Sequence, residues 1–137
     1  MQADRTSDTA QGPDGRGAPA APPASVLGTH YLVELRDCDA ARLERVDDVK
    51  RVMLRAAEES HARIVGSAFH QFQPAGASGV VLIRESHFSI HTWPENRYAA
   101  ADIFTCGDEM DADVAVRVMA DGFGAAGVQV RKIDRGC

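Results

Sequence analysis

A Glu-Ser peptide bond, followed closely by histidine, is the feature of this chain best suited to chemistry. Ser86 follows Glu85 directly, and His91 lies five residues beyond Ser86. A lone cysteine, Cys106, comes shortly afterwards, within the segment Phe104–Asp108. A hydroxyl, an imidazole and a thiol this close together favour a reactive site over simple packing, because each can act as a nucleophile or move a proton.

The chemistry that this order predicts is cleavage of the chain by itself. The hydroxyl of Ser86 can attack the preceding carbonyl if the turn is strained, which converts the Glu85–Ser86 amide into an ester. A base that removes the α-proton of Ser86 then expels Glu85 as a carboxylate by β-elimination. Hydrolysis of the remaining dehydroalanine releases ammonia and leaves a pyruvoyl group. Histidine is the best base near neutral pH, and His91 lies on the strand that Ser86 opens.

Length and composition limit what can surround this site. The chain has 137 residues and a net charge of −5. Residues 1–24 are rich in Ala, Pro, Gly and Asp without apolar periodicity, so we expect a disordered N-terminal tail. We expect residues 25–137 to form one domain, small enough to gain stability from dimerisation. The acidic balance argues against nucleic acid as a partner, and no apolar run is long enough to span a membrane.

The cysteines point to a reducing compartment. Cys38, Cys106 and Cys137 make an odd number, without the CxxC spacing of redox or zinc motifs. The chain also carries no recognisable export signal. We therefore expect a cytoplasmic protein with reduced thiols, in which Cys38 and Cys137 have a structural role or are present by chance.

Apolar periodicity predicts the elements that must position the reactive groups. Alternation and apolar runs predict strands over His30–Arg36, Ala62–Phe72, Gly79–Glu85, His87–Trp93, Tyr98–Thr105 and Val128–Ile133. A 3.6-residue period predicts helices over Asp47–Ser60, capped by Asp47 or Asp48, and over Asp111–Gly122, capped by Asp111. Pro and Gly make Gln73–Ala77 a turn, and the run Val80–Ile83 suggests a strand buried on both faces.

The order of these elements predicts the fold class. A β-α-β-β unit is followed by a second one in the order β-β-α-β, with short links between adjacent strands. This order favours an α+β two-layer sandwich, in which a largely antiparallel sheet carries both helices on one face. The other face of such a sheet would be left uncovered. We therefore expect a partner there, most simply a second copy of the chain.

The residues around Ser86 resemble a known family. The segments Glu85–Glu95 (ESHFSIHTWPE) and Asp102–Gly107 (DIFTCG) are similar to those of the small prokaryotic S-adenosylmethionine decarboxylase proenzymes. The resemblance covers about Gly28 to Ile133, and a motif of this length is specific.

The resemblance implies a role for each reactive residue. Ser86 would become the pyruvoyl cofactor, which forms a Schiff base with the substrate amine, after cleavage from Glu85 into a β chain and an α chain. His91 would be the processing base, and Ser78, in a Gly-rich turn, would assist processing. Cys106 would be the catalytic acid that protonates the decarboxylated carbon. The product would be decarboxylated S-adenosylmethionine, the aminopropyl donor for spermidine synthesis.

The resemblance also implies a substrate site and a dimer. Phe72, Trp93 and Glu95 match positions associated with holding the adenosyl part of S-adenosylmethionine. The family works as a dimer of processed protomers, with sites at or near the interface. Asn96-Arg97 departs from the expected pattern, in which small or aromatic residues are common after Glu95. A guanidinium that faced inward there would repel a sulfonium substrate. We therefore expect Arg97 to point to solvent.

Two other functions remain open at this point. A pyruvoyl-dependent arginine or ornithine decarboxylase would keep the same machinery and change the substrate. An unprocessed, inactive binding or regulatory subunit would keep only the fold, but intact Ser86, His91 and Cys106 argue against it.

Individual residues also have simpler interpretations. His70, His87 and His91 could form a zinc site, although no second cluster with metal spacing supports a metal. Cys106 could be an inert buried thiol. Phe72 and Trp93 could be core aromatics, and Glu95 could be a solvated loop carboxylate.

Overall fold

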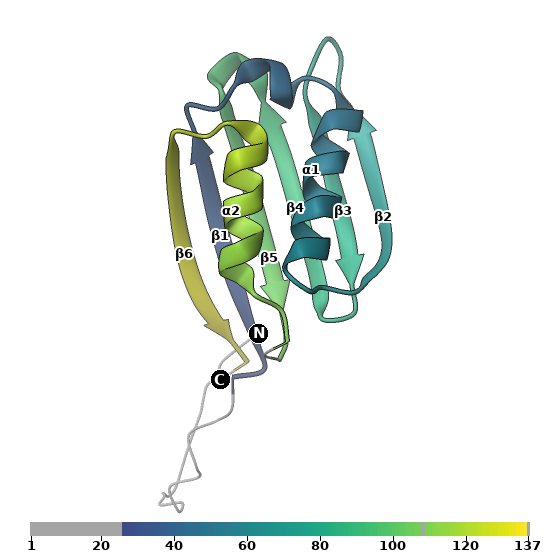
Figure 1. The fold of residues 1–137 in the computed structure, drawn as a ribbon, viewed down its shortest axis with the longest axis vertical. Helices are drawn as coiled ribbons and strands as arrows, with labels where there is room; N and C mark the ends of the chain where they lie inside the picture. The colour runs from purple at the N-terminus through teal and green to yellow at the C-terminus, as the bar shows by residue number, and fades with distance from the viewer. Residues whose placement is uncertain (1–25, 108, 137) are drawn as a thin grey trace, which may run out of the picture.

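The computed structural model describes residues 26–107 and 109–136, and the predicted tail and Cys137 lie outside these residues. The described chain forms a six-stranded sheet in the order β2-β3-β4-β5-β1-β6 (Figure 1). The strands are β1 (Gly28–Arg36), β2 (Ile64–Gln71), β3 (Ala77–Ile83), β4 (Ser86–Trp93), β5 (Tyr98–Thr105) and β6 (Gly127–Arg135). The helices are η2 (Ala40–Leu43), α1 (Val46–Glu59), η3 (Pro94–Asn96) and α2 (Ala112–Phe123), of which η2 and η3 are short 3-10 helices.

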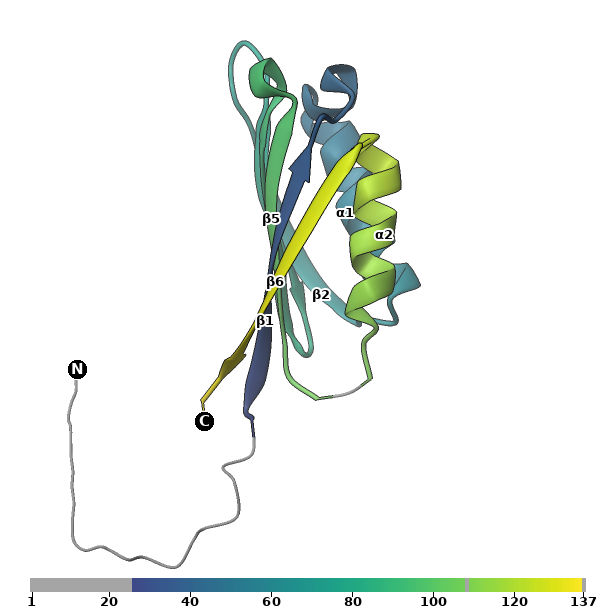
Figure 2. The same cartoon turned by 90° about the vertical axis from the view of Figure 1, so that its left-hand side faces the viewer.

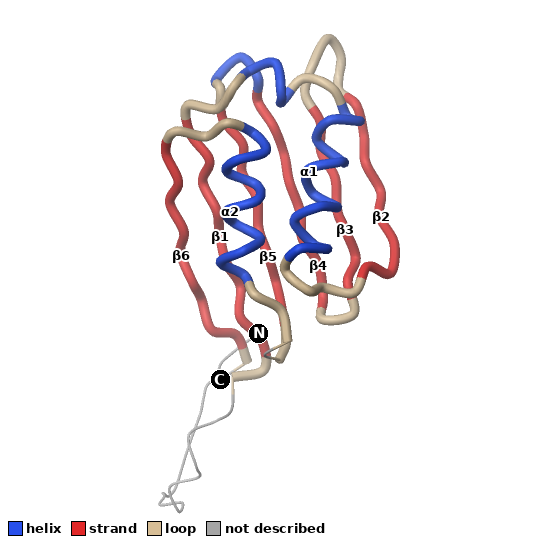
Figure 3. Tube along the Cα trace, viewed as in Figure 1, coloured by secondary structure: helices blue, strands red, loops and turns tan. Residues whose placement is uncertain are grey.

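The predicted fold class is confirmed. Every neighbouring pair of strands is antiparallel. The edge-on view in Figure 2 shows α1 and α2 on the same side of the sheet, so the molecule has two layers. Figure 3 shows the two helices side by side along the strands. None of the helices in the described ranges is long and apolar enough to cross a membrane.

The core lies between the helices and the sheet, where alternate strand residues meet the apolar stripe of each helix. The largest fully buried side chains include Leu35, Met53, Phe88, Ile103, Met119 and Phe123. Cys38, for which a structural role or chance was expected, is also fully buried and belongs to this core. Burial raises the pKa of its thiol, and the charge of Arg97 lowers it to a smaller extent.

The two long helices begin in different ways. At α2 the predicted cap is confirmed, because the Asp111 side chain accepts hydrogen bonds from Asp113 N–H and Val114 N–H. At α1 the predicted caps are wrong, because Asp47 and Asp48 already lie in the first helical turn. The reason lies on β2, where Gln71 Oε1 accepts from the Val46 N–H at 2.7 Å and satisfies the helix start from outside.

The position of β3 corrects two predictions. It begins at Ala77, inside the predicted turn, and ends at Ile83 rather than at residue 85. Its burial alternates, because Val81 and Ile83 are 0% and 4% exposed while Leu82 is 49% exposed. The expectation of a strand buried on both faces is wrong, since the helices cover one face only.

The uncovered face of the sheet is where most polar strand residues gather. Cross-strand pairing places Ser78 opposite His91, and Ser89 opposite Asp102. His87 and Trp93 belong to the same alternating set on β4. The side of the sheet without helices therefore carries Ser78, His91 and Trp93 of the predicted site.

Candidate active site

The Glu85–Ser86 bond lies where the chain turns from β3 into β4. A two-residue turn, Arg84–Glu85, joins the strands, and Ser86 is the first residue of β4. Its φ of +153° is unusual for any residue with a side chain. A backbone in such a sparsely populated region costs on the order of 1–3 kcal/mol, and such strain persists only where the surrounding structure imposes it. The backbone is therefore strained at the serine that is predicted to attack the carbonyl before it.

The carbonyl that Ser86 would attack is held by a hydrogen bond. The backbone N–H of Cys106, at the exit of β5, donates to the Glu85 carbonyl oxygen at 3.0 Å. A donor aimed at this oxygen polarises the carbonyl and can stabilise the negative charge that develops during attack. Cross-strand register, with Ser86 opposite Thr105, brings Cys106 to this position.

The thiol of Cys106 is exposed, so its interpretation as an inert buried thiol is wrong. It lines a cavity of about 380 Å³ together with Glu85, Gly107 and the arginines of the neighbouring turns, Arg63 and Arg84. Cys106 and the predicted cleavage bond therefore share one corner of the fold.

Two buried polar atoms at this corner have no hydrogen-bond partner among the described residues. They are the hydroxyl of Thr105, directly opposite Ser86, and one carboxylate oxygen of Glu85. Unpaired buried polar atoms are costly and call for an explanation. A pyruvoyl group formed from Ser86 fits here, because its carbonyl oxygens are acceptors that the Thr105 hydroxyl lacks.

A polar network that the sequence did not predict runs away from Ser86 across the uncovered face. Ser86 Oγ lies 3.2 Å from His87 Nδ1, and His87 Nε2 lies 3.9 Å from Asp102 Oδ1. Asp102 also accepts a hydrogen bond from Ser89 and is 2.9 Å from His30 Nε2. Alternation along β4 does group His87 with Ser89, but Asp102 and His30 come from β5 and β1.

His91 lies at the other end of β4 from Ser86. It is paired with Ser78 on β3 and Ala100 on β5, whereas Ser86 is paired with Thr105. Five residues of a strand span about 17 Å, at about 3.4 Å each. Ser78 and His91 are thus brought together, with Ser78 in strand β3 rather than in a turn, but neither contacts Ser86 of its own chain.

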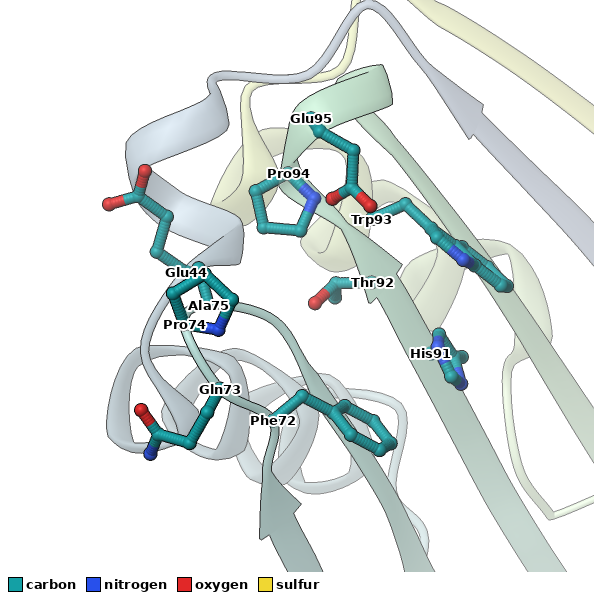
Figure 4. Close-up of a pocket in the computed structure, with 10 residues that line it drawn as sticks. All are labelled: Glu44, Phe72, Gln73, Pro74, Ala75, His91, Thr92, Trp93, Pro94 and Glu95. Carbon is teal, nitrogen blue, oxygen red and sulfur yellow. The ribbon is translucent and has the colours of Figure 1, made fainter.

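The predicted substrate-binding residues share a pocket of about 610 Å³ beside His91. One wall of the pocket is a row of stacked aromatic rings (Figure 4). The ring centroids of Phe72 and His91 are 5.2 Å apart, and those of His91 and Trp93 are 4.0 Å apart. Phe72 and Trp93 are both partly exposed and line the pocket, so their interpretation as core aromatics is wrong. Glu44, at the end of η2, also lines the pocket and was missed from the sequence.

Hydrogen bonds between loops give this pocket its shape. Gln71 Nε2 donates to the carbonyls of Glu44 and Gly76 at 2.9 and 2.8 Å. The buried hydroxyl of Thr92, on β4, donates to the Leu43 carbonyl at 2.8 Å. These bonds join η2, the 72–76 loop and β4, the three segments that form the pocket wall.

Two charged residues, Glu95 and Arg97, come shortly after Trp93 in the sequence. Glu95, in η3, is exposed at the pocket rim near Trp93 (Figure 4). Arg97 is exposed too, as predicted, and its Nε donates to the Cys38 carbonyl at 2.8 Å. The guanidinium is therefore held against the loop after β1.

The zinc interpretation finds no geometric support. Within residues 26–107 and 109–136, no three His, Cys, Asp or Glu side chains converge closely enough to hold a metal ion. His70, His87 and His91 therefore do not form such a group.

Comparison with known proteins identifies the family of the chain. Residues 29–136 match the family model of S-adenosylmethionine decarboxylase. Among curated proteins, the S-adenosylmethionine decarboxylase proenzyme of Pseudomonas paraeruginosa is 47% identical over 114 residues, covering 83% of this chain and 71% of its own. The proenzyme of Thermodesulfovibrio yellowstonii is 41% identical over 110 residues, covering 80% of this chain and 82% of its own.

A solved structure is similar as well. The crystal structure of the adenosylmethionine decarboxylase from Aquifex aeolicus superposes with a TM-score of 0.77 at 37% identity. The match covers 83% of this chain and 94% of the other. The chain therefore belongs to the S-adenosylmethionine decarboxylase family.

Proposed function

We propose that this chain is a proenzyme that cleaves itself between Glu85 and Ser86, and then decarboxylates S-adenosylmethionine to supply aminopropyl groups for spermidine. The observation that carries the proposal is the backbone at Ser86. A serine with φ of +153° has its hydroxyl 3.2 Å from an imidazole, and the carbonyl before it accepts an N–H hydrogen bond. These are the features needed for attack by a hydroxyl on its own preceding peptide bond.

The separation of Ser86 from His91 supports a working unit of two protomers. A base must come within about 3 Å of the proton that it removes, and His91 of the same chain is far outside this range. In such a dimer the uncovered faces of two sheets would pack against each other. A two-fold axis between them, perpendicular to β4 and level with its middle, would bring His91 and Ser78 of the partner subunit opposite Ser86. Such an isologous dimer is the commonest form of oligomer, and it would cover the sheet face without helices. We propose this dimer, working in the cytoplasm.

After cleavage the pyruvoyl group would supply the electron sink for decarboxylation of an α-amino acid. The chain supplies the other requirements. Cys106 is exposed beside residue 86 and is proposed to deliver a proton to the carbon that has lost its carboxylate. The neighbouring hydroxyl of Thr105 has no hydrogen-bond partner within residues 26–107 and 109–136, so it could donate to a carbonyl at residue 86.

The pocket favours S-adenosylmethionine over arginine or ornithine. Phe72 and Trp93 offer flat apolar surfaces on which a purine can stack, whereas a simple amino acid needs no such surface. Glu95 offers a carboxylate that can accept hydrogen bonds from two ribose hydroxyls. In the proposed dimer, this pocket and the partner's Ser86 corner would lie next to each other.

Release of carbon dioxide tests the substrate. Purified, cleaved enzyme is incubated side by side with carboxyl-labelled S-adenosylmethionine, arginine and ornithine. We expect release from S-adenosylmethionine alone. Efficient turnover of either amino acid, without turnover of S-adenosylmethionine, would establish the alternative substrate class instead.

A further inference from the structure

We infer that His87, oriented by Asp102, is the base that starts self-cleavage. In this inference His87 takes the proton of the Ser86 hydroxyl as it attacks the Glu85 carbonyl, and His91 acts only in the later removal of the α-proton. The inference rests on the proposed function, because it divides the steps of the same cleavage between two histidines. It adds a catalytic residue, His87, and a positioning residue, Asp102.

The contact between Ser86 and His87 has the geometry of a nucleophile and its base. The 3.2 Å between Ser86 Oγ and His87 Nδ1 lies at the limit expected for such a pair. To accept this proton, Nδ1 must be unprotonated, so the neutral ring carries its hydrogen on Nε2. That atom lies 3.9 Å from Asp102 Oδ1, which is too far for a hydrogen bond but close enough for the charge of the carboxylate to act on the ring. A carboxylate on this side favours the required tautomer and stabilises the imidazolium that forms.

Asp102 is itself held in place from two sides. Its Oδ1 accepts a hydrogen bond from the Ser89 hydroxyl, and its Oδ2 lies 2.9 Å from His30 Nε2. Arg135 Nη1 lies 3.2 Å from His30 Nδ1. Because arginine can only donate, His30 must accept at Nδ1 and therefore donates from Nε2 to Asp102. The carboxylate thus keeps a fixed orientation toward His87.

The step balances without any co-reactant. The bond from Ser86 Oγ to the Glu85 carbonyl carbon forms, and the bond from that carbon to the Ser86 nitrogen breaks. The hydroxyl proton passes to His87 Nδ1 and then to the departing nitrogen, which becomes a free amine beside the new ester. The Cys106 N–H, 3.0 Å from the Glu85 oxygen, is placed to stabilise the negative charge of the intermediate.

Hydroxylamine separates the two histidines, because it cleaves the ester but leaves an amide intact. Purified His87→Ala and His91→Ala proteins are compared with wild type, with and without hydroxylamine, by intact mass. We expect His91→Ala to accumulate an ester that hydroxylamine cleaves. We expect His87→Ala to remain an uncut amide that resists hydroxylamine, with cleavage about 100-fold slower or more, the lower end of what general-base catalysis supplies. Added imidazole should restore part of the rate of His87→Ala.

Several outcomes would overturn the assignment. Cleavage of His87→Ala at the wild-type rate would remove His87 from the mechanism, and an ester in His87→Ala would move it to a later step. If the alanine variant does not fold, judged by circular dichroism and thermal melting, His87→Gln takes its place in the same comparison. Failure of the wild-type chain to cut itself is a separate result, which would reject the proposed function.

Co-expression gives a second test. In the proposed dimer a Ser86→Ala partner can lend His91 to another chain, but it cannot lend His87, because His87 is adjacent to the serine that it serves. We therefore expect a His87→Ala chain to stay uncut beside a Ser86→Ala partner. Its cleavage in such mixed dimers would contradict the inference.

Discussion

The distance along β4 makes a quantitative prediction about which chain supplies His91. Ser86 and His91 are five residues apart on one strand, which is about 17 Å, whereas proton transfer needs an approach of about 3 Å. No side-chain rotation can close a gap of this size within one protomer. His91 must therefore serve the Ser86 of a partner if it acts in processing at all.

A Ser86→Ala chain should then restore cleavage of a His91→Ala chain. Ser86→Ala and His91→Ala are expressed together, with tags of different mass, and each is also expressed alone. In a mixed two-fold dimer, one of the two sites combines the intact Ser86 of the His91→Ala chain with the intact His91 of its partner. With equal expression and random pairing, about half of the His91→Ala chains lie in mixed dimers and should be cleaved.

Intact mass spectrometry of the mixture reads out the result by tag. The Ser86→Ala chain must stay whole in every sample, which serves as the internal control. If the His91→Ala chain also stays whole in purified mixed dimers, while the wild-type chain is cut, then the proposal that His91 acts on the Ser86 of its partner is wrong.

Three single substitutions test Cys106, Thr92 and Glu95. Cys106→Ala should still cleave itself, because the backbone N–H remains, but should lose most turnover and inactivate its pyruvoyl group by misplaced protonation; normal carbon dioxide release would contradict this. Thr92→Val, in the uncleavable Ser86→Ala background, should lower the free energy of unfolding in urea by about 2–4 kcal/mol, because Leu43 C=O and Ala77 N–H lose their buried partner; an unchanged midpoint would show that these bonds contribute little. Glu95→Gln should raise the KM for S-adenosylmethionine about 10-fold without slowing self-cleavage, as expected for a lost charge-assisted hydrogen bond; an unchanged KM would place Glu95 outside the binding site.

The sequence predicted the elements well, because periodicity reports which face of a strand or helix is buried. The bounds of β5 were predicted to the residue, and α2 within one residue. The errors came from tertiary contacts that periodicity does not contain. The start of α1 depends on the Gln71 side chain from β2. The exposure of Leu82 depends on the uncovered face of the sheet, against which no helix packs.

The site could be predicted only in part, for a similar reason. Residue types and motif identified Ser86, His91 and Cys106, but closeness in sequence was not closeness in space. Ser86 and Cys106 are neighbours because β4 and β5 pair in a particular register. His91, although on the same strand as Ser86, lies far from it. Asp102 and His30 could not be linked to His87 from sequence, because three strands bring them together.

In the proposed function, this chain makes its own cofactor by cutting the bond between Glu85 and Ser86. Intact mass spectrometry of the purified wild-type protein, with Ser86→Ala as the control, shows whether this bond is cut. We predict two fragments, residues 1–85 ending in a free carboxylate and residues 86–137 beginning with a pyruvoyl group. Together they differ from the proenzyme by the gain of water and the loss of ammonia. A wild-type chain that stays whole after prolonged incubation, as the Ser86→Ala control should, would contradict the account.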